Sequence, residues 1–196
     1  MALVHSARPW HAAMGKTTHL SHDGAMELTR LDIDHLTRCV ELAEEGLEAG
    51  DEPFGSILVD ADGVVLYEGR NHVAGGDSTA HPELAIAQWA LGNLEPERRA
   101  TATVYTSGEH CPMCAGAHGW AGLGRIVFAA SAAMLDSWRR EWGAAPGAVA
   151  ALPVNLVVPG IRVDGPADEL VPRLRYLHFQ SFQGSQRGTA SAQGPR

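Results

Sequence analysis

The sequence has few cysteines and no long apolar run. Its 196 residues include three cysteines, two of which lie only three positions apart, and this is a poor framework for disulfide bonds. We therefore expect a reducing compartment and a cytoplasmic location. No stretch is long and apolar enough for a signal peptide or a membrane span, so we expect no membrane partner.

Basic side chains are also scarce. The chain has 15 Lys and Arg residues against 23 Asp and Glu residues, and its formal net charge is −8 with the histidines neutral. Nucleic-acid binding relies on Lys and Arg to neutralise phosphates, and the sequence contains no dense basic run. The composition therefore disfavours a nucleic-acid partner and favours a small, neutral substrate.

Two short motifs carry side chains that suit a zinc site. They are His81-Pro82-Glu83 and, further along the chain, Cys111-Pro112-Met113-Cys114. A zinc ion with three protein ligands keeps its fourth tetrahedral position for water and lowers the pKa of that water to about 7. We predict that His81, Cys111 and Cys114 bind one zinc ion per chain. Glu83 is then the catalytic group that takes and returns the proton.

The prolines in these motifs indicate where the ligands lie. Proline suits the first turn of a helix, where its missing N–H would have no partner, so Pro82 and Pro112 both predict helix starts. Cys111 and Cys114 are then neighbours on one helix face. Two helix N-termini that face each other would gather the three ligands, and their partial positive charge favours thiolates.

Strand and helix patterns alternate along the chain, which predicts an α/β fold. We expect a three-layer α/β/α sandwich with a central mixed five-stranded sheet, and ligands at helix starts beyond the strand ends. The predicted helices cover residues 32–47, 82–91, 111–123, 133–142 and 168–179, with a polar link at 96–100. The predicted strands cover residues 57–59, 64–67, 104–106, 126–130 and 154–158.

The length fits one domain with tails. We expect a weakly ordered N-terminal extension at residues 1–28 and a single domain at residues 29–182. The Gln-, Gly- and Ser-rich segment at residues 183–196 predicts a disordered tail.

Both motifs and their surroundings resemble a known family. An HxE motif followed by closely spaced cysteines is typical of zinc deaminases. The wider pattern resembles the cytidine deaminase-like superfamily, and within it the bacterial guanine deaminases, over about residues 36–130. The further segments that carry this resemblance are Pro53-Phe54-Gly55, Gly69-Arg70-Asn71, Thr79-Ala80-His81 and Trp120.

The resemblance implies further site residues and a homodimer. Asn71 would hydrogen-bond the base ring, while Phe54, Trp120 and Ala80 would line the substrate pocket. Glu141 is the best match for a second catalytic carboxylate, with Asp136 behind it. Each of these has a simpler alternative, because aromatic residues are usually core, asparagine often forms turns, and a charged helix segment can be a solvated face.

Three other side chains near the motifs need an interpretation. His110 stands where the family usually has proline, and we expect it to face solvent or form a local cap. His118 is a poor fourth zinc ligand, because seven helical residues place it roughly 10 Å along the axis from Cys111. Cys39 lies beside an apolar helical stripe and is interpreted as a buried small hydrophobe.

These observations predict a zinc-dependent hydrolytic deaminase that releases ammonia from a free nucleobase or base analogue. A guanine-like purine, an oxidised guanine or an aminotriazine would fit. The alternatives are a nucleoside or tRNA adenosine or cytidine deaminase, and a zinc-stabilised scaffold without turnover. Glu83 argues against the scaffold, because a structural zinc site needs no proton carrier.

Overall fold

Thirteen elements make up the described part of the chain in a computed structural model, which describes residues 28–192. Residues 1–27, which hold most of the predicted N-terminal extension, and residues 193–196 lie outside it. The helices are α1 (Arg30–Glu48), the 3-10 helix η1 (Val73–Gly75), α2 (Pro82–Asn93), α3 (Pro96–Thr101), α4 (Pro112–Ala121), α5 (Ala132–Glu141), α6 (Val154–Val157) and α7 (Val171–Ala192). The strands are β1 (Gly55–Val59), β2 (Val65–Arg70), β3 (Thr103–Gly108), β4 (Arg125–Ala130) and β5 (Val163–Asp164).

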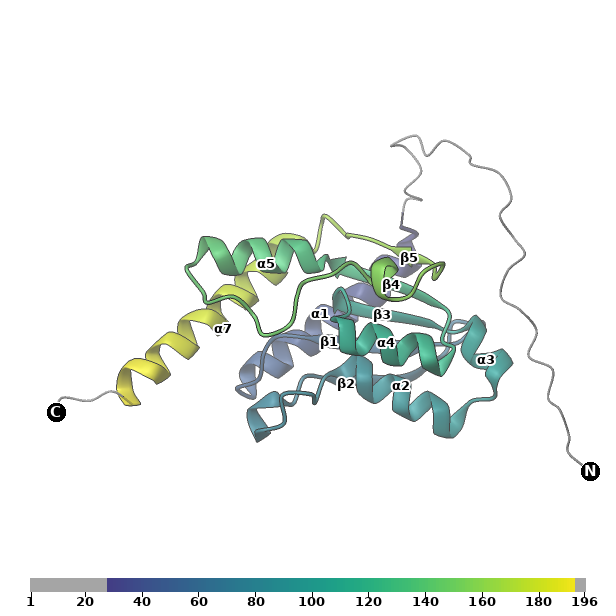
Figure 1. Ribbon diagram of the computed structural model, residues 1–196. Coiled ribbons are helices and arrows are strands. Elements are labelled where there is room, and N and C mark those ends of the chain that lie inside the picture. Colours follow the sequence, from purple (N-terminus) through teal and green to yellow (C-terminus); the bar gives the residue numbers. More distant parts are fainter. Residues whose placement is uncertain (1–27, 193–196) are drawn as a thin grey trace, which may run out of the picture.

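The strands form one mixed five-stranded sheet in the order β2-β1-β3-β4-β5 (Figure 1). Strand β1 is antiparallel to β2 and β3, whereas β3, β4 and β5 are parallel to one another. Gly108 at the end of β3 pairs with Ala130 at the end of β4. The carboxyl ends of these two strands therefore lie level, and α4 and α5 both begin beyond that edge.

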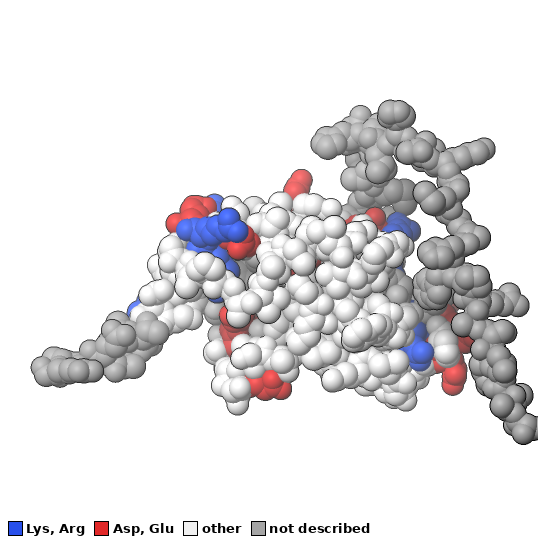
Figure 2. Space-filling view, viewed as in Figure 1, with Lys and Arg blue, Asp and Glu red and all other residues white. Residues whose placement is uncertain are grey.

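Charged side chains are unevenly spread over the surface. Figure 2 shows Arg, Asp and Glu gathered over α5, while the middle of the same face, over α4 and α6, is mostly uncharged. Trp120 of α4 is 92% exposed and Leu156 of α6 is 70% exposed. Within residues 28–192, no helix combines the length and apolar character needed to cross a membrane.

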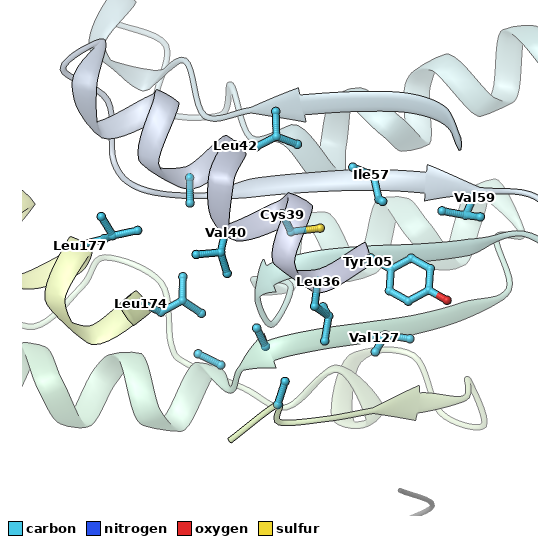
Figure 3. Packing of buried hydrophobic residues seen from close by; sticks show 14 of the residues in the cluster. Leu36, Cys39, Val40, Leu42, Ile57, Val59, Tyr105, Val127, Leu174 and Leu177 are labelled. Carbon is cyan, nitrogen blue, oxygen red and sulfur yellow. The ribbon is translucent and has the colours of Figure 1, made fainter. Parts of the chain in front are cut away.

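Helices cover both faces of the sheet, and each face has its own apolar core. On one face, Leu36 and Val40 of α1 pack with Ile57 and Val127 of the sheet and with Leu174 of α7 (Figure 3). The second core lies between α2 and the other face, and a third connects α4, β4 and α6. The second core includes Leu58, Ile86 and Val104, and the third core includes Ala115, Ile126 and Val154. The predicted α/β/α sandwich with a mixed five-stranded sheet is confirmed.

Gly55 explains how closely α1 approaches β1. A Cβ atom at this position would lie 2.4 Å from the Cys39 carbonyl oxygen and 2.8 Å from the Ala43 amide nitrogen. Such contacts are too short for any side chain, so only glycine lets the helix backbone pack directly on the strand. Cys39 itself is fully buried in this core, as predicted for a small hydrophobe.

The fifth strand was predicted in the wrong place. Residues 154–158 contain the one-turn helix α6, and the edge strand is the two-residue β5. A short apolar run does not distinguish a strand from a buried helical turn. Here the Glu109 carboxylate decides the conformation, because its Oε1 atom accepts the Val154 N–H at 2.9 Å while Val154 is fully buried against α4.

One further prediction about local structure was wrong, and helix α7 runs on into the segment predicted as a tail. The polar link at residues 96–100 is the short helix α3, which begins at a proline and whose Arg99 donates to the Ala121 carbonyl at 2.7 Å. The predicted tail continues α7 as far as Ala192. Phe182 gives a physical reason, because its ring lies 6.0 Å from that of Trp142 and joins α7 to the end of α5.

A buried ion-pair network links α1, β4 and β5 at the amino end of β4. Asp32, which is 2% exposed, accepts hydrogen bonds from Arg125 at 2.6 Å and Tyr105 at 2.9 Å and forms a capping box with Thr29. Arg125 also pairs with Asp164 of β5 at 2.6 Å. Burial would raise the pKa of Asp32, but the bonds from Arg125, Thr29 and Tyr105 outweigh burial and hold that pKa well below its usual range.

We predict that Asp32→Asn lowers the free energy of unfolding by roughly 2–3 kcal/mol at pH 7, because it leaves Arg125 partly unpaired. The folded-state pKa lies below the unfolded value of about 4, so this stabilisation is fully present above that pH and is lost as the pH falls toward the folded value. Urea denaturation at a series of pH values should therefore show the two proteins converging below about pH 4.

Asp34→Asn is the matched control, because Asp34 pairs at 3.0 Å with an Arg30 side chain that is 86% exposed. Its effect should stay below about 0.5 kcal/mol. An equal loss in both variants would contradict the assigned role of Asp32.

Candidate zinc and substrate site

Two helices begin at one point beyond the carboxyl edge of the sheet. His81 is the N-cap residue of α2 and Cys111 is the N-cap residue of α4, and both have extended backbone conformations. Neither side chain caps its own helix, so both are available to a ligand. Helices α2 and α4 pack against each other (Figure 1), and this packing brings the two motifs together.

The three predicted ligands have the spacing that zinc requires. The His81 Nδ1 atom lies 3.7 Å from Cys111 Sγ and 3.6 Å from Cys114 Sγ, and all three ligand atoms lie within 4.8 Å of one another. Tetrahedral bonds of about 2.0–2.3 Å place such ligand atoms about 3.5 Å apart. Within the described residues no fourth His, Cys, Asp or Glu joins this group. His81, Cys111 and Cys114 therefore fit a zinc ion with one position open.

The electrostatics of the cluster favour a bound cation. The hydrogen bond with Cys114, followed by the one with His81, lowers the pKa of Cys111 to about 4. Sharing a proton with Cys111, together with burial, raises the pKa of Cys114, and the contact with Cys111 raises the pKa of His81. The cluster thus carries a thiolate at neutral pH before any metal binds, and metal binding would release the remaining protons.

Glu83 lies beside the cluster and is buried against the sheet. Its side chain is 5% exposed, and it contacts the Cys114 thiol. The Oε1 atom accepts from the Thr106 hydroxyl at 2.9 Å and lies 3.2 Å from the Ser56 hydroxyl. Burial raises the pKa of Glu83, which is the direction that a group needs if it is to accept and return a proton near neutral pH.

Asn71 is held at the end of β2 with its side chain unpartnered. The residue is 1% exposed, and neither its Oδ1 nor its Nδ2 atom has a protein partner. Its backbone is fixed instead, because its N–H donates to the Phe54 carbonyl at 3.0 Å and its own carbonyl accepts from Arg70 at 3.0 Å. A buried amide without a partner is costly, so this side chain is prepared for a ligand.

Asp51 explains why the Asn71 segment is rigid. Its Oδ2 atom accepts from Arg70 at 2.7 Å, and its Oδ1 atom accepts the Ala74 N–H at 2.7 Å. The carboxylate therefore ties both sides of Asn71 to the loop that follows α1. Sequence reasoning missed Asp51, and an isolated aspartate after a helix gives no signal of this role.

Ala80 and Phe54 border different cavities. Ala80 lines a cavity of about 360 Å³ together with His81, and its carbonyl accepts the His72 N–H at 3.0 Å. Phe54 lines a cavity of about 400 Å³ between α5 and α7, where its ring meets His178 with centroids 4.9 Å apart. No zinc ligand lines the larger cavity. Phe54 nevertheless adjoins the site, because its carbonyl holds Asn71.

Trp120 and Glu141 do not lie beside the zinc ligands within this chain, and the roles assigned to them stay predictions. Trp120 lies at the far end of α4, and its side chain is 92% exposed. Glu141 lies at the far end of α5, where its Oε1 atom accepts from Arg175 at 2.6 Å on the surface. Both helices start at the site edge and lead away from it, so a residue near the end of either helix is carried out of reach.

The expectation that His110 faces solvent was also wrong. His110 is 1% exposed and its ring lies 5.3 Å from that of His118, with neither ring nitrogen partnered by protein. Burial, and then His118, lowers the pKa of His110 well below its usual range. His118 bonds to the Gly124 carbonyl at 3.0 Å and lies outside the metal group, as the helix spacing predicted.

Comparison with known proteins agrees with this architecture. Residues 29–130 match the cytidine and deoxycytidylate deaminase zinc-binding region, which is more than half of the chain. A probable cytosine deaminase from Schizosaccharomyces pombe is 34% identical over 122 residues, covering 61% of this chain and 73% of that protein. Guanine deaminase from Bacillus subtilis is 41% identical over 97 residues, covering 48% of this chain and 62% of that enzyme.

Other relatives differ in the substrate that their names state. A tRNA-specific adenosine deaminase from Haemophilus influenzae is 33% identical over 110 residues, covering 56% of this chain and 64% of that enzyme. The solved structure of guanine deaminase from Nitrosomonas europaea has a TM-score of 0.57 at 20% identity, covering 86% of this chain and 98% of that one, and this likeness concerns the fold alone.

A zinc cluster at two helix starts, a buried glutamate beside it and a mixed five-stranded sheet together define a zinc-dependent deaminase domain. The chain belongs to the cytidine and deoxycytidylate deaminase zinc-binding family.

We predict that Cys114→Ser reduces the bound zinc from one ion per chain to a small fraction, because a hydroxyl is a far weaker zinc ligand than a thiolate. Removal of zinc with a chelator should also lower the melting temperature, since an ion that binds the folded state stabilises it. Elemental analysis by mass spectrometry and thermal denaturation would measure both effects.

Cys39→Ala is the control for this experiment, because Cys39 is equally buried but lies outside the metal group. It should keep one zinc ion per chain. Loss of zinc from this variant alone, or full zinc content in the Cys114 variant, would refute the assignment.

Proposed function

We propose that this chain is a hydrolytic deaminase of a free nucleobase or base analogue, with a guanine-like purine, an oxidised guanine or an aminotriazine as its substrate class. The observation that supports a base is Asn71, whose buried amide offers an unpaired donor and an unpaired acceptor. Its neighbour His72 donates to the carbonyl of Ala80, the residue before the ligand His81. The edge of a heterocyclic base presents the complementary pair. Phe54, which holds Asn71 through its carbonyl, supplies an aromatic border.

In this proposal the protein groups divide the work. Zinc held by His81, Cys111 and Cys114 supplies a Lewis acid that makes water nucleophilic at neutral pH. Glu83 would take one proton from the attacking water and pass it to the ring nitrogen. It would then take the proton of the newly added hydroxyl group and pass it to the leaving amine, so that ammonia departs and a carbonyl remains. The burial that raises the pKa of Glu83 suits both directions of transfer.

The tRNA deaminases among the relatives make a polynucleotide the main alternative substrate. The net charge of −8 argues against this alternative, because binding to a polyanion depends on basic side chains. The arginines over α5 and α7 do not form a free basic surface, since Arg140 pairs with Asp136, Arg173 with Glu44 and Arg175 with Glu141.

We therefore predict that tRNA is not retarded by the zinc-loaded protein in a native gel at physiological salt. A zinc-loaded tRNA deaminase of the same family run beside it would serve as the positive control. Salt-sensitive retardation of tRNA by this chain would overturn the preference for a free base.

The homodimer and the cytoplasmic location remain proposals that accompany this function. The mostly uncharged face over α4 and α6, with its exposed Trp120 and Leu156, supports self-association. Small-molecule substrates and the few cysteines support an intracellular setting.

The proposal predicts ammonia release when the zinc-loaded protein is incubated with at least one base of a panel that contains guanine, 8-oxoguanine, cytosine, adenine, their nucleosides and aminotriazines. Glu83→Gln should keep its zinc and lose turnover by several orders of magnitude, because the ligands stay and the proton carrier is removed. A coupled ammonia assay and metal analysis would measure both.

Glu109→Gln offers a control, because Glu109 is a nearby carboxylate that binds only the backbone N–H groups of Ala132 and Val154 at 2.9 Å. Its turnover should far exceed that of the Glu83 variant. No ammonia from any base would refute the proposed function, and full turnover without the Glu83 carboxylate would refute its role.

A further inference from the structure

Two buried hydroxyl groups lie beneath Glu83, and the chemistry described above does not use them. Ser56 of β1 and Thr106 of β3 are directly paired across the antiparallel strands. Both side chains are fully buried. Buried strand positions normally hold apolar residues. The next pair on the same sheet face, Leu58 and Val104, is apolar and belongs to the core under α2.

The hydroxyls form a compact network with the carboxylate. Thr106 Oγ1 lies 2.9 Å from Glu83 Oε1, and Ser56 Oγ lies 3.2 Å from the same oxygen. The two hydroxyls lie 2.9 Å from each other, and Thr106 Oγ1 also lies 2.9 Å from the Gly108 carbonyl oxygen. Both contacts to Glu83 thus fall on Oε1 alone, which fixes one end of the carboxylate to the sheet.

The two hydroxyls can anchor the carboxylate together. Each hydroxyl donates one hydrogen bond and accepts others, so Thr106 can donate to Oε1 while Ser56 donates either to Oε1 or to the Thr106 oxygen. In both arrangements Thr106 is the residue that binds the carboxylate at the shorter distance, and Ser56 supports it.

We propose that Thr106, supported by Ser56, is a positioning residue that holds the Glu83 carboxylate in one place. The proposal rests on the proposed function for the role of Glu83 as proton carrier. A carboxylate that carries protons in a reaction must be held in the productive geometry, and hydrogen bonds from buried strand residues supply such an anchor. The hydrogen bonds of the Ser56 and Thr106 hydroxyls involve no zinc ligand.

Thr106→Val tests the proposal, because valine keeps the shape of threonine and removes its hydroxyl. We expect kcat to fall roughly 10- to 100-fold on the base identified in the ammonia screen, the usual effect of removing a hydrogen bond to a charged group or a supporting partner of a metal site. KM should change by less than about threefold, because substrate binding is left intact. Thr106→Ser, which restores the hydroxyl, should recover most of the lost kcat.

Ser107→Ala is the matched control. Ser107 is the next residue of β3, is equally buried, and uses its hydroxyl only to accept the Gly55 N–H at 3.1 Å. It should match the Thr106→Val variant in lost stability but keep its kcat. Equal kcat values for these two variants, or failure of Thr106→Ser to exceed Thr106→Val, would overturn the proposal.

A readout without turnover separates this proposal from the proposed function. Crystal structures of the zinc-loaded wild type and Thr106→Val should show one Glu83 side-chain position in the wild type and a displaced or multiple position in the variant, with equal zinc content. If no base releases ammonia, the proposed function fails, and these two structures still decide whether Thr106 positions Glu83. An unchanged Glu83 in the variant would refute the positioning role.

Discussion

The site depends on the meeting of two helix N-termini. Because α2 and α4 begin at the same edge of the sheet, the partial positive charge of their first turns acts on one small volume, and thiolates are favoured there. The same meeting of helix starts places Cys114 and His81 beside Cys111, and their hydrogen bonds lower the pKa of the Cys111 thiol. The other site residues lie around these helix starts. Glu83 lies in the first turn of α2, and Asn71 follows the end of β2.

Charged side chains at both ends of the sheet connect it to the surrounding helices. At the amino end of β4, Arg125 joins Asp32 of α1 to Asp164 of β5. At the carboxyl end, Glu109 holds the starts of α5 and α6 by accepting the Ala132 and Val154 N–H groups. A rigid sheet between these anchors lets the short side chains of Ser56 and Thr106 reach the Glu83 carboxylate with little freedom to lose.

The sequence predicted the parts of the site that depend on residue chemistry and was less informative where side-chain direction decides. His81, Cys111 and Cys114 are residue types that bind zinc, and their spacing in the sequence is specific. They therefore predicted a zinc cluster, and the geometry of that cluster is confirmed. Trp120 and Glu141 were assigned from a resemblance, and their direction depends on how far along a helix each lies. Ser56 and Thr106 left a weak signal, since hydroxyls interrupt otherwise apolar strands, but their partner on another element was not visible in the sequence.

In the proposed enzyme, the residues for catalysis and the residues for substrate choice are therefore held by different parts of the fold. The groups that move protons are held by the sheet and by helix starts, which tolerate little change. Phe54 links the base-reading amide to the rest of the molecule, because its carbonyl binds Asn71 while its ring meets His178 of α7. Burial lowers the pKa of His178 to about 3, so α7 presents an uncharged ring to Phe54. A substitution on α7 can thus alter the border of the base site without disturbing the zinc ligands or Glu83.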